Sequence, residues 1–188
     1  MRLGSPVLIA IVVTLMAASS VSAQPALYTG LLTGHVGSAD GGDVRDGGLT
    51  LGASVGVHDG GGLGAELDLG HTRRFDDFRF VESGITSVMV NFLGMYPHSR
   101  FRPFVVAGGG LIRVRTSLAL GEPVTSRTDF GLNGGGGVLV MFGDVVGIRG
   151  DVRYFRFVQR HEDLPLLDNG FFDYWRTSVG FTFAWPIK

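Results

Sequence analysis

Eight segments in which apolar and polar residues alternate follow one another along this chain, separated by turn-forming residues. A period of two predicts β-strands with one apolar face and one polar face. The last segment shows the alternation most clearly, because Trp175, Val179 and Phe181 share one face while Arg176 and Ser178 share the other. The predicted strands occupy residues 27–38, 47–58, 62–73, 83–96, 101–115, 128–142, 145–157 and 173–185.

The connections between these segments alternate between short and long. The short ones, at 58–61, 97–100 and 143–144, are rich in turn-forming residues. The longer polar ones lie at 39–46, 74–82, 116–127 and 158–172. Short turns at one end and long loops at the other are typical of outer-membrane barrels, whereas a soluble sandwich has no reason to sort its loops. The sequence therefore predicts an all-β, eight-stranded antiparallel up-and-down transmembrane β-barrel.

The N-terminal segment has the features of a secretory signal peptide. Arg2 supplies a positive charge, residues 7–18 form an apolar run, and Val21-Ser22-Ala23 is a small-x-small cleavage site. The run is shorter than the roughly 20 apolar residues of a membrane-spanning helix, although an uncleaved anchor is the alternative. We predict a signal peptide over 1–23, cleaved after Ala23, and an outer-membrane β-barrel domain over 24–188.

Composition narrows the classes of function. The chain has 16 basic and 17 acidic residues, whereas proteins that bind nucleic acid normally have a basic excess. It has no cysteine, so neither a disulfide nor a lipid-anchored cysteine is available. Its mean hydropathy is positive, yet no window after residue 23 holds 18 consecutive apolar residues. Apolar residues interleaved with polar ones fit strands that cross a membrane, and we predict no nucleic-acid partner.

The polar faces of three predicted strands carry charges that balance in sign. The residues are Glu66 and Asp68 in the third strand, Arg149, Asp151 and Arg153 in the seventh, and Arg176 in the eighth. The interior of an eight-stranded barrel is narrow and filled by side chains, and an unpaired buried charge is costly. We therefore predict an interior salt-bridge network of these six residues. The alternative is that they form the solvated face of a soluble sheet.

The last predicted strand ends in a recognisable pattern. Residues 178–185, SVGFTFAW, read polar, any, Gly, any, any, aromatic, any, aromatic. Together with the eight strands, the loop asymmetry and the signal peptide, this pattern resembles the small outer-membrane β-barrel family of the OmpA-barrel and OmpX type, over essentially the whole mature chain. The resemblance implies a bacterial outer-membrane location and an insertion signal that the barrel-assembly machinery reads. Its residues would be Ser178, Gly180, Phe183 and Trp185, although Pro186-Ile187-Lys188 follow where family members often end.

No group of residues has the spacing of a catalytic, cofactor or metal site. The five histidines, His35, His58, His71, His98 and His161, form no HxH or HxxxH pair. The glycine runs 108–110 and 134–137 lie inside strands, and no Gly-Lys-Ser/Thr follows them, so they predict strand curvature and not a phosphate loop. The His-x-Ser pattern of lipid A deacylases is absent. We predict no cofactor, no metal and no enzymatic activity.

The long loops are the remaining candidates for function. Residues 73–82 and 160–173 mix charges with phenylalanines, which suits contact with lipopolysaccharide phosphates, bridging cations or a protein surface. The alternative is that these loops are simply solvated. We predict a non-enzymatic outer-membrane protein with a structural or surface-interaction role through four extracellular loops, surrounded by outer-membrane lipid and lipopolysaccharide. A narrow porin-like channel and a lipid A-modifying enzyme are the alternative functions.

Overall fold

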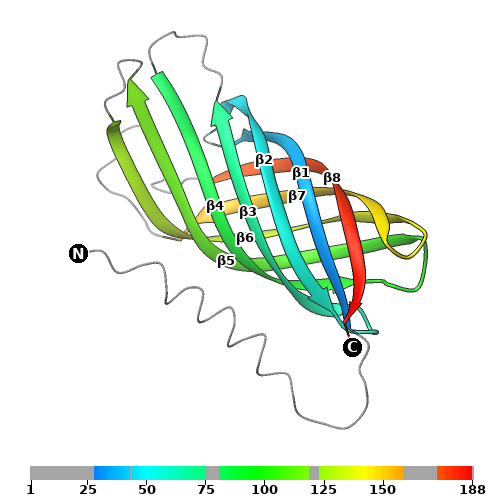
Figure 1. The fold of residues 1–188 in the computed structure, drawn as a ribbon. Helices are drawn as coiled ribbons and strands as arrows, with labels where there is room; N and C mark the ends of the chain where they lie inside the picture. The colour runs from blue at the N-terminus through cyan, green and yellow to red at the C-terminus, as the bar shows by residue number, and fades with distance from the viewer. Residues whose placement is uncertain (1–27, 43, 75–80, 119–122, 159–172, 188) are drawn as a thin grey trace.

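Eight antiparallel strands close into one barrel in the computed structural model, which describes residues 28–42, 44–74, 81–118, 123–158 and 173–187 (Figure 1). The strands are β1 (Tyr28–Gly41), β2 (Val44–His58), β3 (Leu63–Arg74), β4 (Val81–Met95), β5 (Phe101–Leu118), β6 (Pro123–Phe142), β7 (Val146–Phe157) and β8 (Asp173–Ile187). Each strand pairs with the next one in the chain, and β8 pairs with β1 to close the barrel. The predicted fold and strand order are confirmed. The described residues contain no helix long and apolar enough to cross a membrane.

The period-two alternation in the sequence becomes a strict alternation of burial along the strands. From Val146 to Phe157, the even-numbered residues of β7 lie on the outer surface or partly covered, and the odd-numbered ones are buried. The same holds for β8, where Tyr174, Arg176 and Ser178 point inward and Trp175 points outward. Successive side chains of a strand leave on opposite faces, so the sequence alternation alone assigns them to the lumen or the exterior.

The outer surface of the barrel is apolar all the way round. Every strand contributes large apolar side chains that are exposed in the isolated barrel. Examples, one from each strand in order, are Leu32, Leu51, Leu69, Phe92, Val105, Leu132, Val152 and Phe181. A continuous apolar exterior of this extent is far larger than the patches that soluble monomers expose. With the charged residues inside, this distribution is that of a membrane barrel and overturns the soluble-sheet alternative.

Two of the four connections expected to be long are short. Strands β1 and β2 extend through most of the predicted loop 39–46, so only residues 42 and 43 separate them. The ladder continues because Ala39 and Val44 bury their side chains in the lumen, and Gly41 and Gly42, with φ of 76° and 58°, make the reversal. Likewise, β5 continues to Leu118 and β6 begins at Pro123, so only residues 119–122 of the predicted loop 116–127 separate the two strands. Polar composition suggested loops, but pairing continues there.

The turns predicted to be short are short. In the connection between β2 and β3, the Asp59 carboxylate accepts a hydrogen bond from the Leu63 amide at 2.9 Å, and the Asp59 carbonyl accepts one from the Gly62 amide at 3.0 Å. Gly62 has φ of 89°, a conformation that favours glycine. Residues 96–100 and 143–145 make the other two turns at the same end of the barrel. In barrels of this class the end with short turns faces the periplasm.

Candidate functional site

The six charged residues singled out in the sequence come together in the middle of the lumen. Each is at most 7% exposed. Glu66 and Asp68 project from β3, and Arg149, Asp151 and Arg153 project from β7, with Arg176 on the neighbouring strand β8. Strand β3 is not adjacent to β7 or β8, so contacts between these groups span the lumen. The three guanidinium groups and three carboxylates give the cluster equal numbers of positive and negative side chains.

Four ion pairs cross the lumen from β3. The Glu66 carboxylate lies 2.5 Å from Arg149 Nη1 and 2.9 Å from Arg153 Nη1. The Asp68 carboxylate lies 2.8 Å from Arg176 Nη2, with Arg153 Nη1 at 3.6 Å from its other oxygen. Each carboxylate of β3 therefore meets two guanidinium groups, which ties β3 to the opposite wall of the barrel.

Contacts within the wall formed by β7 and β8 complete the network. Asp151 Oδ2 lies 3.2 Å from Arg149 Nε and 3.1 Å from Arg153 Nη2. Its other oxygen accepts a hydrogen bond from Ser178 Oγ at 2.9 Å. The guanidinium of Arg149 also lies over the Phe104 ring, 4.1 Å from its centroid. Buried charges need several partners of this kind to offset the loss of water.

The wall formed by β5 and β6 leaves room for these long side chains. Four of its inward positions are glycines: Gly108, Gly110, Gly135 and Gly137. A Cβ atom on Gly108 would lie 2.0 Å from the Val90 carbonyl oxygen, and one on Gly110 would lie 2.0 Å from the Val88 carbonyl oxygen, both in the backbone of β4. Close approach of the neighbouring strand backbone therefore requires glycine at these positions, and these glycines add no side chain to the charged layer.

Further buried polar residues surround the network, and sequence analysis did not single them out. Asn91 Nδ2 donates to Glu66 at 3.4 Å, and the Thr33 and Thr182 hydroxyls lie 2.8 Å apart. His35 and Asn133 are also buried on inward positions. The signal that could have identified them is their position in the period-two alternation, because each lies at an inward-facing position of its strand. Uncharged polar residues are equally common on solvated faces, so the alternation alone could not distinguish a lumenal position from a solvated one.

Two apolar layers enclose the polar layer from above and below. The layer on the short-turn side consists of Leu31, Leu93, Met95, Phe104, Val106, Leu139, Met141 and Ala184. The layer on the opposite side consists of Ala39, Val44, Ile85, Met89, Ile112, Phe155, Phe157 and Tyr174. Within it the Phe155 and Tyr174 rings stack, with centroids 4.8 Å apart. The lumen thus has the order apolar, charged, apolar along the barrel axis.

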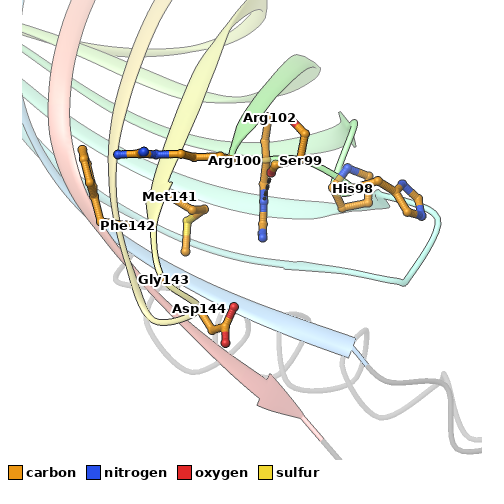
Figure 2. A pocket seen from close by; sticks show the side chains of 9 residues that line it. His98, Ser99, Arg100, Arg102, Met141, Phe142, Gly143 and Asp144 are labelled. Carbon is orange, nitrogen blue, oxygen red and sulfur yellow. Dashed lines mark hydrogen bonds between the residues drawn. The ribbon is translucent and has the colours of Figure 1, made fainter.

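Among the described residues, the serine and histidine side chains considered for catalysis make hydrogen bonds or ring contacts with other groups and not with each other. The adjacent His98 and Ser99 lie in the turn between β4 and β5 (Figure 2). Ser99 Oγ donates to the Phe101 carbonyl, while the His98 ring lies beside Tyr96, with centroids 5.5 Å apart. His71 faces outward and bonds Thr86 Oγ1 at 2.9 Å. Within the described ranges, no three histidine or carboxylate side chains lie close enough to hold a metal ion.

The four residues of the predicted insertion signal all lie in β8. Ser178 points into the lumen and Gly180 is likewise buried against β1, whereas Phe183 and Trp185 are exposed on the outer surface. The strand continues to Ile187, so the residues after the aromatic extend the ladder with β1. The predicted signal peptide 1–23, His161 and most of the two charged loops, residues 75–80 and 159–172, lie outside the described residues.

Comparisons with known proteins bear on the class of this barrel. The sequence matches the family model of the outer membrane protein beta-barrel domain over residues 6–185. No curated protein matches the sequence. Among solved structures, neisserial surface protein A matches with a TM-score of 0.61 and 16% identity, covering 83% of this chain and 96% of that chain. Ail, the attachment invasion locus protein of Yersinia pestis, solved with the heparin analogue sucrose octasulfate, matches with a TM-score of 0.58 and 14% identity over 85% and 99%.

A third solved structure, the outer membrane protein OprG of Pseudomonas aeruginosa, matches with a TM-score of 0.55 and 14% identity, covering 85% of this chain and 96% of that chain. At these identities the likeness concerns the fold. The family model, in contrast, covers most of the sequence, and it agrees with the eight-stranded barrel and its apolar exterior. The predicted family and location are confirmed: this chain belongs to the family of outer membrane proteins with this β-barrel domain, and it resides in the bacterial outer membrane.

Proposed function

We propose that this protein is a closed, non-conducting barrel without enzymatic activity, whose role is structural or lies in surface interaction through its extracellular loops. The observation that carries the proposal is the layered lumen, in which paired charges are enclosed between two apolar layers. Water and ions need a continuous polar path, and apolar constrictions resist wetting. A porin-like channel would have to open both layers, which argues against that alternative.

We expect the reconstituted protein to show no steady openings in planar lipid bilayers. The Leu139→Ala variant thins the layer on the short-turn side, and Phe155→Ala thins the opposite layer. Each single variant should stay silent because the other layer remains intact. The measurement is single-channel current at fixed voltage, with a known porin as a positive control. Steady openings of the unmutated barrel would overturn the closed state and favour the channel.

The absence of an enzymatic role is supported by the hydrogen bond that Ser99, the serine next to His98, makes. The Ser99 hydroxyl donates to a backbone carbonyl, so no base activates it, and the neighbouring His98 is exposed on the same turn. We expect lipid A from cells that produce the protein to match lipid A from cells that lack it, as measured by mass spectrometry. Reproducible gain or loss of an acyl chain would contradict the proposal.

The remaining partners proposed from the sequence have a chemical rationale on the barrel surface. Phe183 and Trp185 present aromatic rings to the exterior at one end of β8, where barrel-assembly machinery would contact an incoming strand. At the opposite end, the exposed side chain of Arg113 suits lipopolysaccharide phosphates, whereas Arg127 is ion-paired with Asp129 at 2.8 Å. These features support lipid, lipopolysaccharide and assembly machinery as partners, and they leave the extracellular partner of the loops to be identified.

A further inference from the structure

A groove of about 450 Å³ lies on the outer surface of the barrel between β6 and β7. Its lining includes Leu132 and Gly134 from β6 and Tyr154 and Arg156 from β7. In the ladder Gly134 lies opposite Tyr154, and Leu132 lies opposite Arg156. All four occupy outward positions, which alternate along their strands with residues that face the lumen. The groove therefore opens to the membrane and not to the lumen.

The groove exists because the side chains on its two sides lean apart. Leu132 leans toward β5, since a Cβ atom on the outward Gly109 of that strand would lie 3.2 Å from Leu132 Cδ2. Tyr154 leans toward β8, where its ring lies beside Trp175, with centroids 5.1 Å apart, and its hydroxyl donates to the Asp173 carboxylate. Neither side chain covers the space between the two strands.

The floor of the groove is open at Gly134. A Cβ atom there would have only the Val106 carbonyl oxygen, at 4.0 Å, within reach. Leu132 and Val158 give the groove apolar sides. A hydrocarbon chain seated in such a groove gains van der Waals contacts on its floor and both sides, whereas a flat surface offers contacts on one side only.

The position of the groove on the barrel indicates which leaflet supplies the chain. Tyr154 lines the groove beside the exposed Trp175, and exposed aromatic rings mark the membrane–water interface. Val158, also in the lining, is the last described residue before the long connection 159–172. Long connections face the exterior in barrels of this class, so the groove lies in the outer leaflet, close to the lipid headgroups.

The charges at this end of the barrel indicate the kind of lipid. Arg156 is exposed and lines the groove. Among the described outward positions of β5 to β8 at this end, Arg113, Arg115 and Arg156 face a single carboxylate, Asp173. The described outward strand positions at the short-turn end contain no arginine or lysine. Guanidinium groups bind phosphate oxygens, and arginines near a membrane surface attract anionic lipids, so this distribution favours a phosphorylated lipid in the outer leaflet.

We propose that the groove between β6 and β7 binds one acyl chain of lipid A, the phosphorylated glycolipid of the outer leaflet, with a lipid A phosphate beside Arg156. The inference rests on the proposed contact with lipopolysaccharide and deepens it, because it states where on the barrel the contact is made and through which part of the molecule. Lipid A carries several acyl chains on one phosphorylated disaccharide. The chain in the groove and the phosphate at its rim therefore belong to the same ligand.

The test is native mass spectrometry of the full barrel from micelles that contain either diphosphorylated lipid A or its dephosphorylated form. The Gly134→Leu variant fills the groove and should lower the retention of both forms about ten-fold, the equivalent of roughly ten close carbon contacts. The Arg156→Gln variant should lower only the retention of the diphosphorylated form, by about five-fold, as expected for one arginine near a membrane surface.

Two matched controls change the same residue types elsewhere on the outer surface. Gly34→Leu adds a leucine to β1 at an exposed position where no atom lies within 4 Å of the new Cβ atom. Arg73→Gln removes an exposed arginine from β3. Both controls should retain lipid A as the unmutated barrel does. A heat-modifiability gel establishes that every variant is folded.

The possible failures separate the groove from the wider proposal. Unchanged retention by Gly134→Leu, or an equal loss in Gly34→Leu, overturns the groove and leaves lipopolysaccharide as a partner. An equal effect of Arg156→Gln on both forms overturns the phosphate contact. Displacement of lipid A by an equal concentration of phosphatidylglycerol with the same chain length would show that any acyl chain fits, and it would overturn the assignment to lipid A. Retention of neither form by the unmutated barrel overturns both the groove and the proposed lipopolysaccharide contact.

Discussion

Replacement of Arg153 by alanine is expected to lower the free energy of unfolding of this barrel by about 3–5 kcal/mol. Arg153 is 1% exposed and ion-pairs with all three carboxylates of the lumen, at 2.9 Å from Glu66, 3.6 Å from Asp68 and 3.1 Å from Asp151. Its loss leaves three buried carboxylates with only two guanidinium groups. The uncompensated charge, and not the loss of packing alone, makes the effect large.

Denaturant titration of the barrel in lipid vesicles measures this change, with tryptophan fluorescence and the heat-dependent gel shift as independent signals of unfolding. Arg113→Ala is the matched control, because Arg113 is exposed and donates a single hydrogen bond to Ser126. It should change the free energy by less than about 1 kcal/mol. Equal effects of the two variants would show that Arg153 does not carry the paired charges of the lumen.

Replacing both partners of an ion pair is a second test of whether an uncompensated buried charge causes the loss of stability. Asp68→Asn with Arg176→Met removes both charges of the pair that spans the lumen at 2.8 Å. Replacing a buried pair by uncharged side chains of similar size costs less than removing one partner, because no lone charge is left behind. The double variant should therefore be more stable than Arg176→Ala. The opposite order would mean that packing, and not charge balance, dominates this layer.

The faces of the strands could be predicted from the sequence, whereas the contacts across the lumen could not. Alternation assigned Glu66 and Arg149 to the inside because neighbouring side chains point to opposite faces of a strand. Which carboxylate meets which arginine depends on the stagger and tilt of strands that are not adjacent, and no local pattern encodes these. For the same reason, the layered order of the lumen emerges only when eight inward faces are stacked.

Loop lengths and the groove between β6 and β7 were missed for different physical reasons. Residues 39–46 are glycine-rich and polar, a composition shared by turns and by the twisted ends of strands. The two apolar residues that face the lumen there, Ala39 and Val44, were too few to reveal a continuing strand. The groove exists because Leu132 leans toward β5 whereas Tyr154 leans toward β8. Sequence alternation identifies outward positions but not the direction in which their side chains lean.

Two glycines of β6 lie directly beside the strand that carries most of the charged layer. Gly135 lies opposite Arg153 and Gly137 lies opposite Asp151 in the β6–β7 ladder. A Cβ atom on Gly135 would contact the Val152 carbonyl oxygen and lie 2.8 Å from the Arg153 Cα atom. The neighbouring backbone thus occupies the space that a side chain would need. Any side chain there must move β7, which carries three of the six charged residues.

The Gly135→Ala variant should therefore destabilise the barrel by about 3 kcal/mol, the upper part of the range for overpacking, since backbone yields less easily than a side chain. Gly134→Ala is the control one residue away. A Cβ atom there has only the Val106 carbonyl, at 4.0 Å, within reach, so its effect should stay below about 1 kcal/mol. Denaturant titration in vesicles measures both variants.

The same strand links this prediction to the loss of Arg153. If the added methyl group acts by shifting β7, it also lengthens the ion pairs that Arg153 makes, so Gly135→Ala and Arg153→Ala remove part of the same interaction. The combined variant should then lose less stability than the sum of the two single changes, as residues in contact do. Full additivity would mean that the glycine serves only the local path of β6. Equal effects of Gly134→Ala and Gly135→Ala would show that close approach of the β7 backbone is not what requires glycine at this position.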